Sequence, residues 1–184
     1  MKNILLILLF STTFMACVEV KFENSQPAKT KNLSEFPTEL QGKYLIEFKD
    51  SINELDTFII AKNYFSELTL GQKASSKPKK DVFLSDSLVV KQIDNNFTIN
   101  IFENDFWMVV LLKPNATGYD VLWINGENED TAEQLNLTTK VKTIKNEDGE
   151  VEALIMNPKK KEFAKMIDNQ YIFTPIYKLI KVKQ

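Results

Sequence analysis

Cys17 is the only cysteine in the 184-residue chain, which contains neither histidine nor arginine. A lone thiol excludes an internal disulfide and a CxxC metal or redox site. Without histidine the chain lacks the commonest general base and transition-metal ligand, and with it every Ser-His-Asp or Cys-His arrangement. Without arginine it cannot bind carboxylates or phosphates through a bidentate guanidinium group. The remaining chemistry is that of one thiol, lysines, carboxylates and aromatic rings.

Carboxylates are the only acid-base groups left, and they are densest at two places. Glu103 lies close to Asp105, and Glu127 lies close to Glu129 and Asp130. The second cluster does not match the twelve-residue calcium-binding loop. Solvated turns explain both clusters better, so we expect no metal site and no cofactor. A hydrolase built on a carboxylate pair is the third interpretation of the chain.

Aromatic side chains could line a cavity for an apolar ligand or form a carbohydrate-binding platform. Packing in the hydrophobic core is the more common role of such side chains, and it is the alternative for each of them. The candidates for lining a ligand site are Tyr44, Phe97, Phe102, Trp107, Tyr119 and Trp123.

The first sixteen residues have the pattern of an export signal. Lys2 precedes an apolar run at residues 4–10, which is too short for a membrane span of about 20 apolar residues. The run ends at Phe14-Met15-Ala16-Cys17, which resembles the lipobox of bacterial lipoproteins, with Ala16 at the small position before the cysteine. An ordinary secretory signal ending near Ala16 is the alternative.

The lipobox resemblance implies the following organisation. Residues 1–16 are a signal peptide that is removed, and Cys17 carries lipid and becomes the mature N-terminus. The protein is then held on a membrane of the bacterial cell envelope, the outer membrane being the expected one, with the leaflet undetermined. Several acyl chains give a stable anchor, whereas one chain binds reversibly.

The rest of the chain is long enough for one domain with a substantial core. Residues 17–33 are mostly polar and lack a clear period, which predicts a flexible tether with an end-to-end distance of roughly 20 to 24 Å. Residues 34–184 form the predicted single β-rich domain. The formal net charge of −2 gives no basic excess, so we expect no nucleic-acid partner.

Alternating apolar and polar residues, separated by turn residues, predict a mainly β domain with one late helix at residues 158–168. Hairpin connections predict an antiparallel barrel or sandwich of roughly nine strands. Residues 106–112 are apolar at both parities, which predicts a central strand covered on both faces. The expected strands are residues 44–49, 55–65, 87–93, 97–103, 106–113, 119–125, 135–143, 150–156 and 171–182.

Gly42-Lys43-Tyr44, at the start of the first strand, is similar to the Gly-x-Trp segment that opens the lipocalin barrel. Tyr44 stands where the family has tryptophan. The resemblance implies a lipocalin-like barrel around an apolar small molecule.

Three tripeptides resemble the Asp-Ser/Thr-aliphatic acceptor that some Gram-negative envelope systems use for O-glycosylation. They are Asp50-Ser51-Ile52, Asp86-Ser87-Leu88 and Asp130-Thr131-Ala132. The resemblance makes Ser51, Ser87 and Thr131 candidate modification sites.

These observations predict a non-enzymatic, lipid-anchored envelope protein. Its β-rich domain is expected to bind either an apolar small molecule or another envelope component. The alternative is a structural or inhibitory protein-interaction subunit without a small-molecule site.

Overall fold

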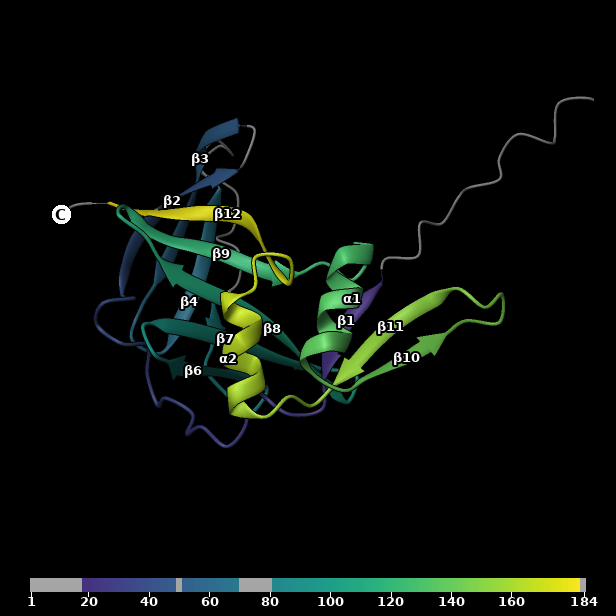
Figure 1. Cartoon of the computed structure of the whole chain (residues 1–184). Coiled ribbons are helices and arrows are strands. Elements are labelled where there is room, and N and C mark those ends of the chain that lie inside the picture. The colour runs from purple at the N-terminus through teal and green to yellow at the C-terminus, as the bar shows by residue number, and fades with distance from the viewer. Residues whose placement is uncertain (1–17, 49–50, 70–80, 183–184) are drawn as a thin grey trace, which may run out of the picture.

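The computed structural model describes residues 18–48, 51–69 and 81–182 (Figure 1). The prediction of a mainly β, largely antiparallel fold is confirmed, since the described part of the chain forms one 12-stranded sheet. The strands are β1 (Glu19–Phe22), β2 (Gly42–Phe48), β3 (Ser51–Ile60), β4 (Tyr64–Thr69), β5 (Val82–Phe83), β6 (Leu88–Ile93), β7 (Asn96–Glu103), β8 (Phe106–Pro114), β9 (Gly118–Ile124), β10 (Val141–Lys145), β11 (Val151–Met156) and β12 (Phe173–Lys181). The helices are α1 (Glu129–Thr138) and α2 (Lys160–Asp168).

The main path of the sheet runs in the order β6-β7-β8-β9-β12-β2-β3-β4-β5, with every neighbouring pair antiparallel. β12, the last strand in the chain, lies between β9 and β2. The two ends of the path, β5 and β6, do not pair among the described strands, so the barrel is open. The sheet nevertheless curls, because Val90 of β6 and Ile60 of β3 belong to the same core cluster.

The segment at residues 33–40 covers the opening. The Leu33 amide donates to the carbonyl of Val90 on β6 at 2.8 Å, and the Phe36 amide donates to the carbonyl of Lys62 in the β3–β4 connection at 2.8 Å. Phe36 and Leu40 are fully buried beneath this segment. Two backbone hydrogen bonds and the side chains of Phe36 and Leu40 therefore cover the gap between the unpaired ends of the sheet, β5 and β6.

β8 separates two hydrophobic cores, and its sequence explains why. Leu112 packs into the core enclosed by the curled sheet, whereas Val109 and Leu111 pack into a second core on the opposite face. The second core is covered by the helices, which contribute Leu135 from α1 and Phe163 from α2. Apolar residues at both parities of β8 thus reflect burial on both faces, as predicted.

A second branch of the sheet leaves β8 at Trp107, which pairs with Phe22 of β1. β1 runs parallel to β11 with Glu19 opposite Ala153, and β11 pairs antiparallel with β10. In Figure 1 the β10–β11 hairpin projects away from the curled sheet. The strand expected at residues 150–156 corresponds to β11 of this branch, whereas β1 was not among the expected strands.

The segment expected to be a flexible tether, residues 17–33, differs in the structure from Val18 onwards. Phe22 in β1 is buried against Phe163, with ring centroids 6.1 Å apart. Gln26 is fully buried. Its backbone amide donates to Asn100 Oδ1 at 2.6 Å, and its backbone carbonyl accepts from Thr98 Oγ1 at 2.6 Å. The domain therefore begins within this segment, because its side chains complete the second core and a buried polar network.

The strand expected at residues 135–143 is replaced by the end of α1 followed by β10. Asn128 caps the helix by accepting from the Asp130 amide at 2.9 Å, and Glu129 and Asp130 lie in the first turn, where the helix dipole favours acids. Leu135 is fully buried whereas Leu137 is 73% exposed. The alternation of leucines in the sequence thus does not correspond to one buried strand face.

Candidate functional site

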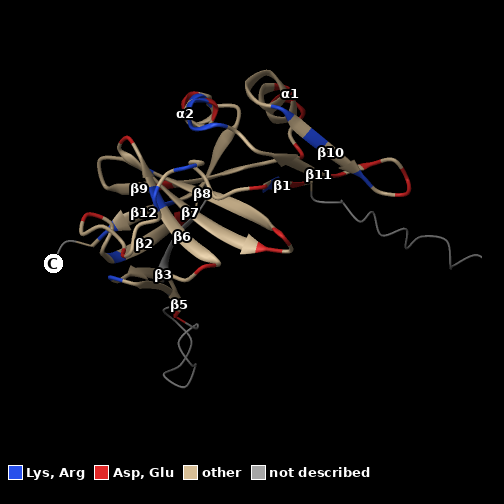
Figure 2. Cartoon of the chain, turned by 90° about the horizontal axis from the view of Figure 1, so that it is seen from below, with Lys and Arg blue, Asp and Glu red and all other residues tan. Residues whose placement is uncertain are grey.

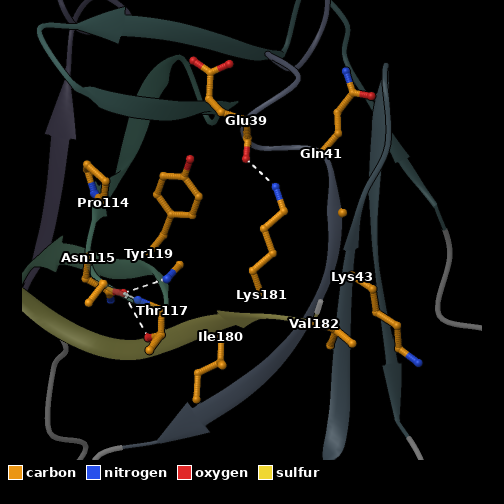
Figure 3. A pocket seen from close by; sticks show the side chains of 13 residues that line it. Glu39, Gln41, Lys43, Pro114, Asn115, Thr117, Tyr119, Ile180, Lys181 and Val182 are labelled. Carbon is orange, nitrogen blue, oxygen red and sulfur yellow. Dashed lines mark hydrogen bonds between the residues drawn. The ribbon is translucent and has the colours of Figure 1, made fainter. Parts of the chain in front are cut away.

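A pocket of about 940 Å³ lies at one end of the curled sheet (Figure 3). It lies where β2 begins, β8 turns into β9 and β12 ends. We call it the mouth pocket, and its lining consists of Glu39, residues 41–43, residues 114–119 and residues 180–182. Its volume lies in the range typical of small-molecule sites, about 300 to 1,000 Å³.

The β8–β9 turn forms one wall, and its sequence fixes its shape. Asn115 Oδ1 accepts from the Thr117 amide at 2.9 Å and from the Gly118 amide at 2.8 Å, an arrangement in which an asparagine side chain closes a turn. A side chain at Gly118 would place its Cβ 2.1 Å from the Leu179 carbonyl oxygen on β12. Glycine therefore lets this wall lie against β12 at the edge of the pocket.

Tyr119 and Tyr44 separate the pocket from the core beneath it. Their rings pack edge to face with centroids 6.3 Å apart, and Phe97 packs on Tyr119 at 6.4 Å. Tyr44 is fully buried and its hydroxyl donates to the Leu40 carbonyl at 2.7 Å, whereas Tyr119 is 7% exposed and lines the pocket. Among the described residues, Tyr44, Phe97 and Leu112 are buried in the core of the curled sheet, and of the two tyrosines only Tyr119 lines the pocket.

Charged groups of both signs face the pocket. Lys181 Nζ donates to the Glu39 carbonyl oxygen at 2.7 Å and lies 5.8 Å from the centre of the Tyr44 ring. Burial, together with the Glu39 carboxylate, raises the pKa of the Tyr119 hydroxyl. Figure 3 shows this hydroxyl pointing toward the side of the pocket on which Glu39 lies. At neutral pH the phenol is protonated, so it can donate a hydrogen bond to a ligand.

The structure brings together only some of the aromatic residues that were candidates for a ligand site. Tyr119 contacts both Tyr44 and Phe97 in the core, and of these three only Tyr119 lines the mouth pocket.

The other three aromatic candidates lie elsewhere. Phe102 packs against Trp107 on the β7–β8 hairpin, with the ring centroids 5.1 Å apart and the rings tilted by 50°, and Trp123 is 49% exposed on β9. The six candidates therefore do not line one cavity.

Sequence reasoning missed Glu39, Gly42 and Lys181 as pocket residues. Lys181 and Glu39 are 142 positions apart and meet only because β12 returns beside β2. The one local signal was the Pro-Asn-Ala-Thr-Gly turn at residues 114–118, whose residue types predicted the connection but not its neighbours.

The predicted carboxylate clusters lie at exposed turns. Glu103 and Asp105 are exposed in the β7–β8 turn, and Glu127, Glu129 and Asp130 are exposed at the start of α1. Within residues 18–48, 51–69 and 81–182, no group of three or more His, Cys, Asp or Glu side chains could hold a metal ion.

The candidate modification sites have different outcomes. Cys17 and the side chain of Ser51 lie outside the described residues. Ser87 is exposed, so O-glycosylation there stays a prediction. Thr131 is fully buried and its hydroxyl donates to the Tyr171 carbonyl at 2.7 Å. The prediction that Thr131 is an acceptor site is therefore wrong, because its hydroxyl oxygen is inaccessible in the folded domain.

Neither helix in the described part of the chain is long and apolar enough to cross a membrane. No protein-family model, curated protein or solved structure matches the chain.

Proposed function

We propose that the protein is a lipid-anchored, non-enzymatic binding protein of the bacterial cell envelope, and that its ligand occupies the mouth pocket. The observation that carries this proposal is a pocket of about 940 Å³ above a closed aromatic floor. We place the ligand at the mouth instead of inside a barrel, because Tyr44, Phe97 and Leu112 are buried in the core of the curled sheet.

The lining indicates an amphipathic ligand. Pro114, Ile180 and Val182 offer apolar surface, whereas Tyr119 and Lys181 offer hydrogen-bond donors. The apolar part of the ligand would lie against β12, and an acceptor such as a carbonyl or carboxylate oxygen would face the two donors. Small-molecule sites commonly combine an apolar lining with a few polar groups that fix orientation.

The membrane attachment rests on the lipobox resemblance at Cys17, and the position of β1 adds a geometric consequence. β1 begins at Glu19, so only Val18 separates the lipidated residue from the sheet. Two residues span at most about 7 Å. In this proposal the domain lies directly at the membrane surface instead of moving on a tether of roughly 20 Å.

Filling the pocket tests the binding proposal. Ala116 is exposed on the β8–β9 turn and lines the pocket, so Ala116→Trp should occupy the ligand's space. Asp148→Trp, in the exposed β10–β11 turn, is the matched control. Native mass spectrometry of the full-length chain in a non-ionic detergent should show the same bound small molecule on wild type and control, and none on Ala116→Trp.

Two results would contradict ligand binding at the mouth pocket. One is a small molecule that remains on Ala116→Trp as on wild type, and the other is the absence of bound mass on all three proteins. The second result would favour the alternative, a protein-interaction subunit. That alternative is supported by Phe102, which is 42% exposed although its ring packs against Trp107.

A further inference from the structure

A second cavity, of about 670 Å³, lies between the segment at residues 24–29 and the start of α2. Four lysines line it, from three separate parts of the chain: Lys29, Lys91, Lys159 and Lys160. We call it the lysine pocket. No aspartate or glutamate belongs to its lining, although acidic residues outnumber basic ones in the whole chain, 25 to 23. Figure 2 shows lysines in blue on α2, and acidic residues in red in turns such as that between β10 and β11.

Lys91 distinguishes this pocket from a group of solvated surface lysines. The residue is only 4% exposed, and its Nζ donates to the carbonyl oxygens of Ser25 at 2.9 Å and Pro27 at 3.1 Å. An ammonium group has three donors, so these two carbonyls leave one unused. No described carboxylate forms an ion pair with Lys91. Burial lowers the pKa of this amine, which means that its positive charge is poorly solvated.

The wall that carries these carbonyls is held in place independently of any ligand. Between Ser25 and Pro27, the buried Gln26 hydrogen-bonds through its backbone to Asn100 and Thr98 of β7, both at 2.6 Å. Lys91 lies on the neighbouring strand β6 and pairs with Thr98 in register. The pocket is therefore preformed, and its buried cation is fixed relative to the sheet.

Two carboxylates hydrogen-bond to residues that line the pocket. Glu23 accepts from Asn157 Nδ2 at 2.9 Å, and Glu162 accepts from the Lys159 amide at 2.9 Å and from Thr139 Oγ1 at 3.2 Å. The first amides of α2 add partial positive charge at the same end of the helix, because they lack partners within the helix. The charge around the pocket is thus predominantly positive.

We propose that the lysine pocket binds a phosphate-bearing anion, with Lys91 at its base and Lys29, Lys159 and Lys160 around it. A phosphate group offers more acceptor oxygens than a carboxylate and at least one negative charge, and a diphosphate or phosphate monoester carries more than one, which suits several ammonium donors. At about 670 Å³ the pocket is far larger than the roughly 30 Å³ that one water molecule occupies in the liquid, so it has room for a group larger than a single small ion. The anion is therefore a diphosphate or a phosphate ester, either free in solution or in a phospholipid headgroup.

This inference does not depend on the mouth pocket, which shares no residue with the lysine pocket. Isothermal titration calorimetry of the full-length chain in a non-ionic detergent tests it with two probes, inorganic pyrophosphate and dihexanoyl phosphatidylglycerol. Lys91→Met, which keeps the apolar stem, and the exposed double variant K159A/K160A should each weaken binding about tenfold or more. Lys165→Ala, at the other end of α2, is the control and should stay within about twofold of wild type.

The two probes distinguish the sources of the phosphate. Tighter binding of pyrophosphate supports a soluble phosphorylated ligand, and tighter binding of the phosphatidylglycerol supports a lipid headgroup. The inference is overturned if wild type binds neither probe, or if K159A/K160A binds as tightly as wild type. Because both substituted lysines are exposed, the double variant gives this answer even if Lys91→Met does not fold.

Discussion

Tyr44 joins the floor of the mouth pocket to the segment that covers the opening of the sheet. Its hydroxyl is buried and donates to the Leu40 carbonyl at 2.7 Å. Tyr44→Phe removes this hydrogen bond and leaves the carbonyl unpaired, so we expect the free energy of unfolding to fall by about 1–2 kcal/mol. Urea denaturation measures it, with Tyr171→Phe, whose side chain is 50% exposed, expected to change stability by less than about 0.5 kcal/mol.

Tyr44 also makes stability depend on alkaline pH. Burial, with a smaller contribution from Tyr119, raises the pKa of Tyr44, and burial with Glu39 raises that of Tyr119. Above about pH 10 the unfolded chain loses phenolic protons that the folded chain keeps, so the free energy of unfolding decreases as pH rises through that range. Tyr44→Phe should make this decrease shallower. An unchanged slope in denaturation curves measured above pH 10 would contradict the assignment.

Core packing, the alternative for all six aromatic candidates, holds for Tyr44, Phe97 and Tyr119, which are buried. It does not hold for Phe102 and Trp123, which are exposed. The mouth pocket could not be predicted residue by residue, since Glu39 and Lys181 become neighbours only through the position of β12 between β9 and β2. The lysine pocket was missed for a similar reason, although Lys159 and Lys160 were visible at the start of a helix.

At the level of elements, β1 is the clearest difference from expectation. Val18, Val20 and Phe22 alternate with Glu19 and Lys21, which is a strand pattern, but the run is short and was grouped with a polar tether. The structure uses the apolar members of this run in the second core.

Removing the buried ring of β1 tests whether this strand belongs to the fold. We expect Phe22→Ala to cost about 3–5 kcal/mol, because it leaves a cavity beside Phe163. Chemical denaturation gives the value, and Leu137→Ala, at a 73% exposed position, is the control expected to change little. A flexible tether would predict no effect from either substitution.

α1 shows why a local pattern can predict the wrong element. Leu135 and Leu137 alternate with polar residues as in a strand, but the cap at Asn128 and the acids after it favour a helix. Asn128→Ala removes the cap and should lower the free energy of unfolding by about 1 kcal/mol. Asn125→Ala, in the preceding turn, is a comparison that leaves the cap intact. Equal stability of Asn128→Ala and wild type would show that capping does not hold this helix.

For the whole molecule, the fold class followed from the sequence because hairpin connections and alternation dominate residues 42–124. The central position of β8 was predicted from its consecutive apolar residues, whose side chains face both sides of the sheet. The opening between β5 and β6 and its cover at residues 33–40 could not be predicted from the sequence. The cover is held by backbone hydrogen bonds of an irregular segment, and such bonds leave no periodic pattern of apolar residues.

The position of β1 in the whole molecule bears on how the proposed lipid anchor would place the domain. β1 begins at Glu19, and the second branch of the sheet lies beside it. A lipid on Cys17 would therefore hold the β1–β11–β10 end of the molecule at the bilayer surface. In the proposed lipid-anchored form, the short connection would limit the orientations of the two pockets relative to the membrane.

The most direct test of a lipid-anchored binding protein is the intact mass of the chain recovered from the membrane fraction, measured beside a Cys17→Ser variant. We predict that the wild-type chain begins at Cys17 and carries acyl chains, and that Cys17→Ser leaves the membrane fraction. A wild-type chain with another N-terminus or no acyl mass, or a serine variant retained on the membrane as wild type is, would contradict the proposal.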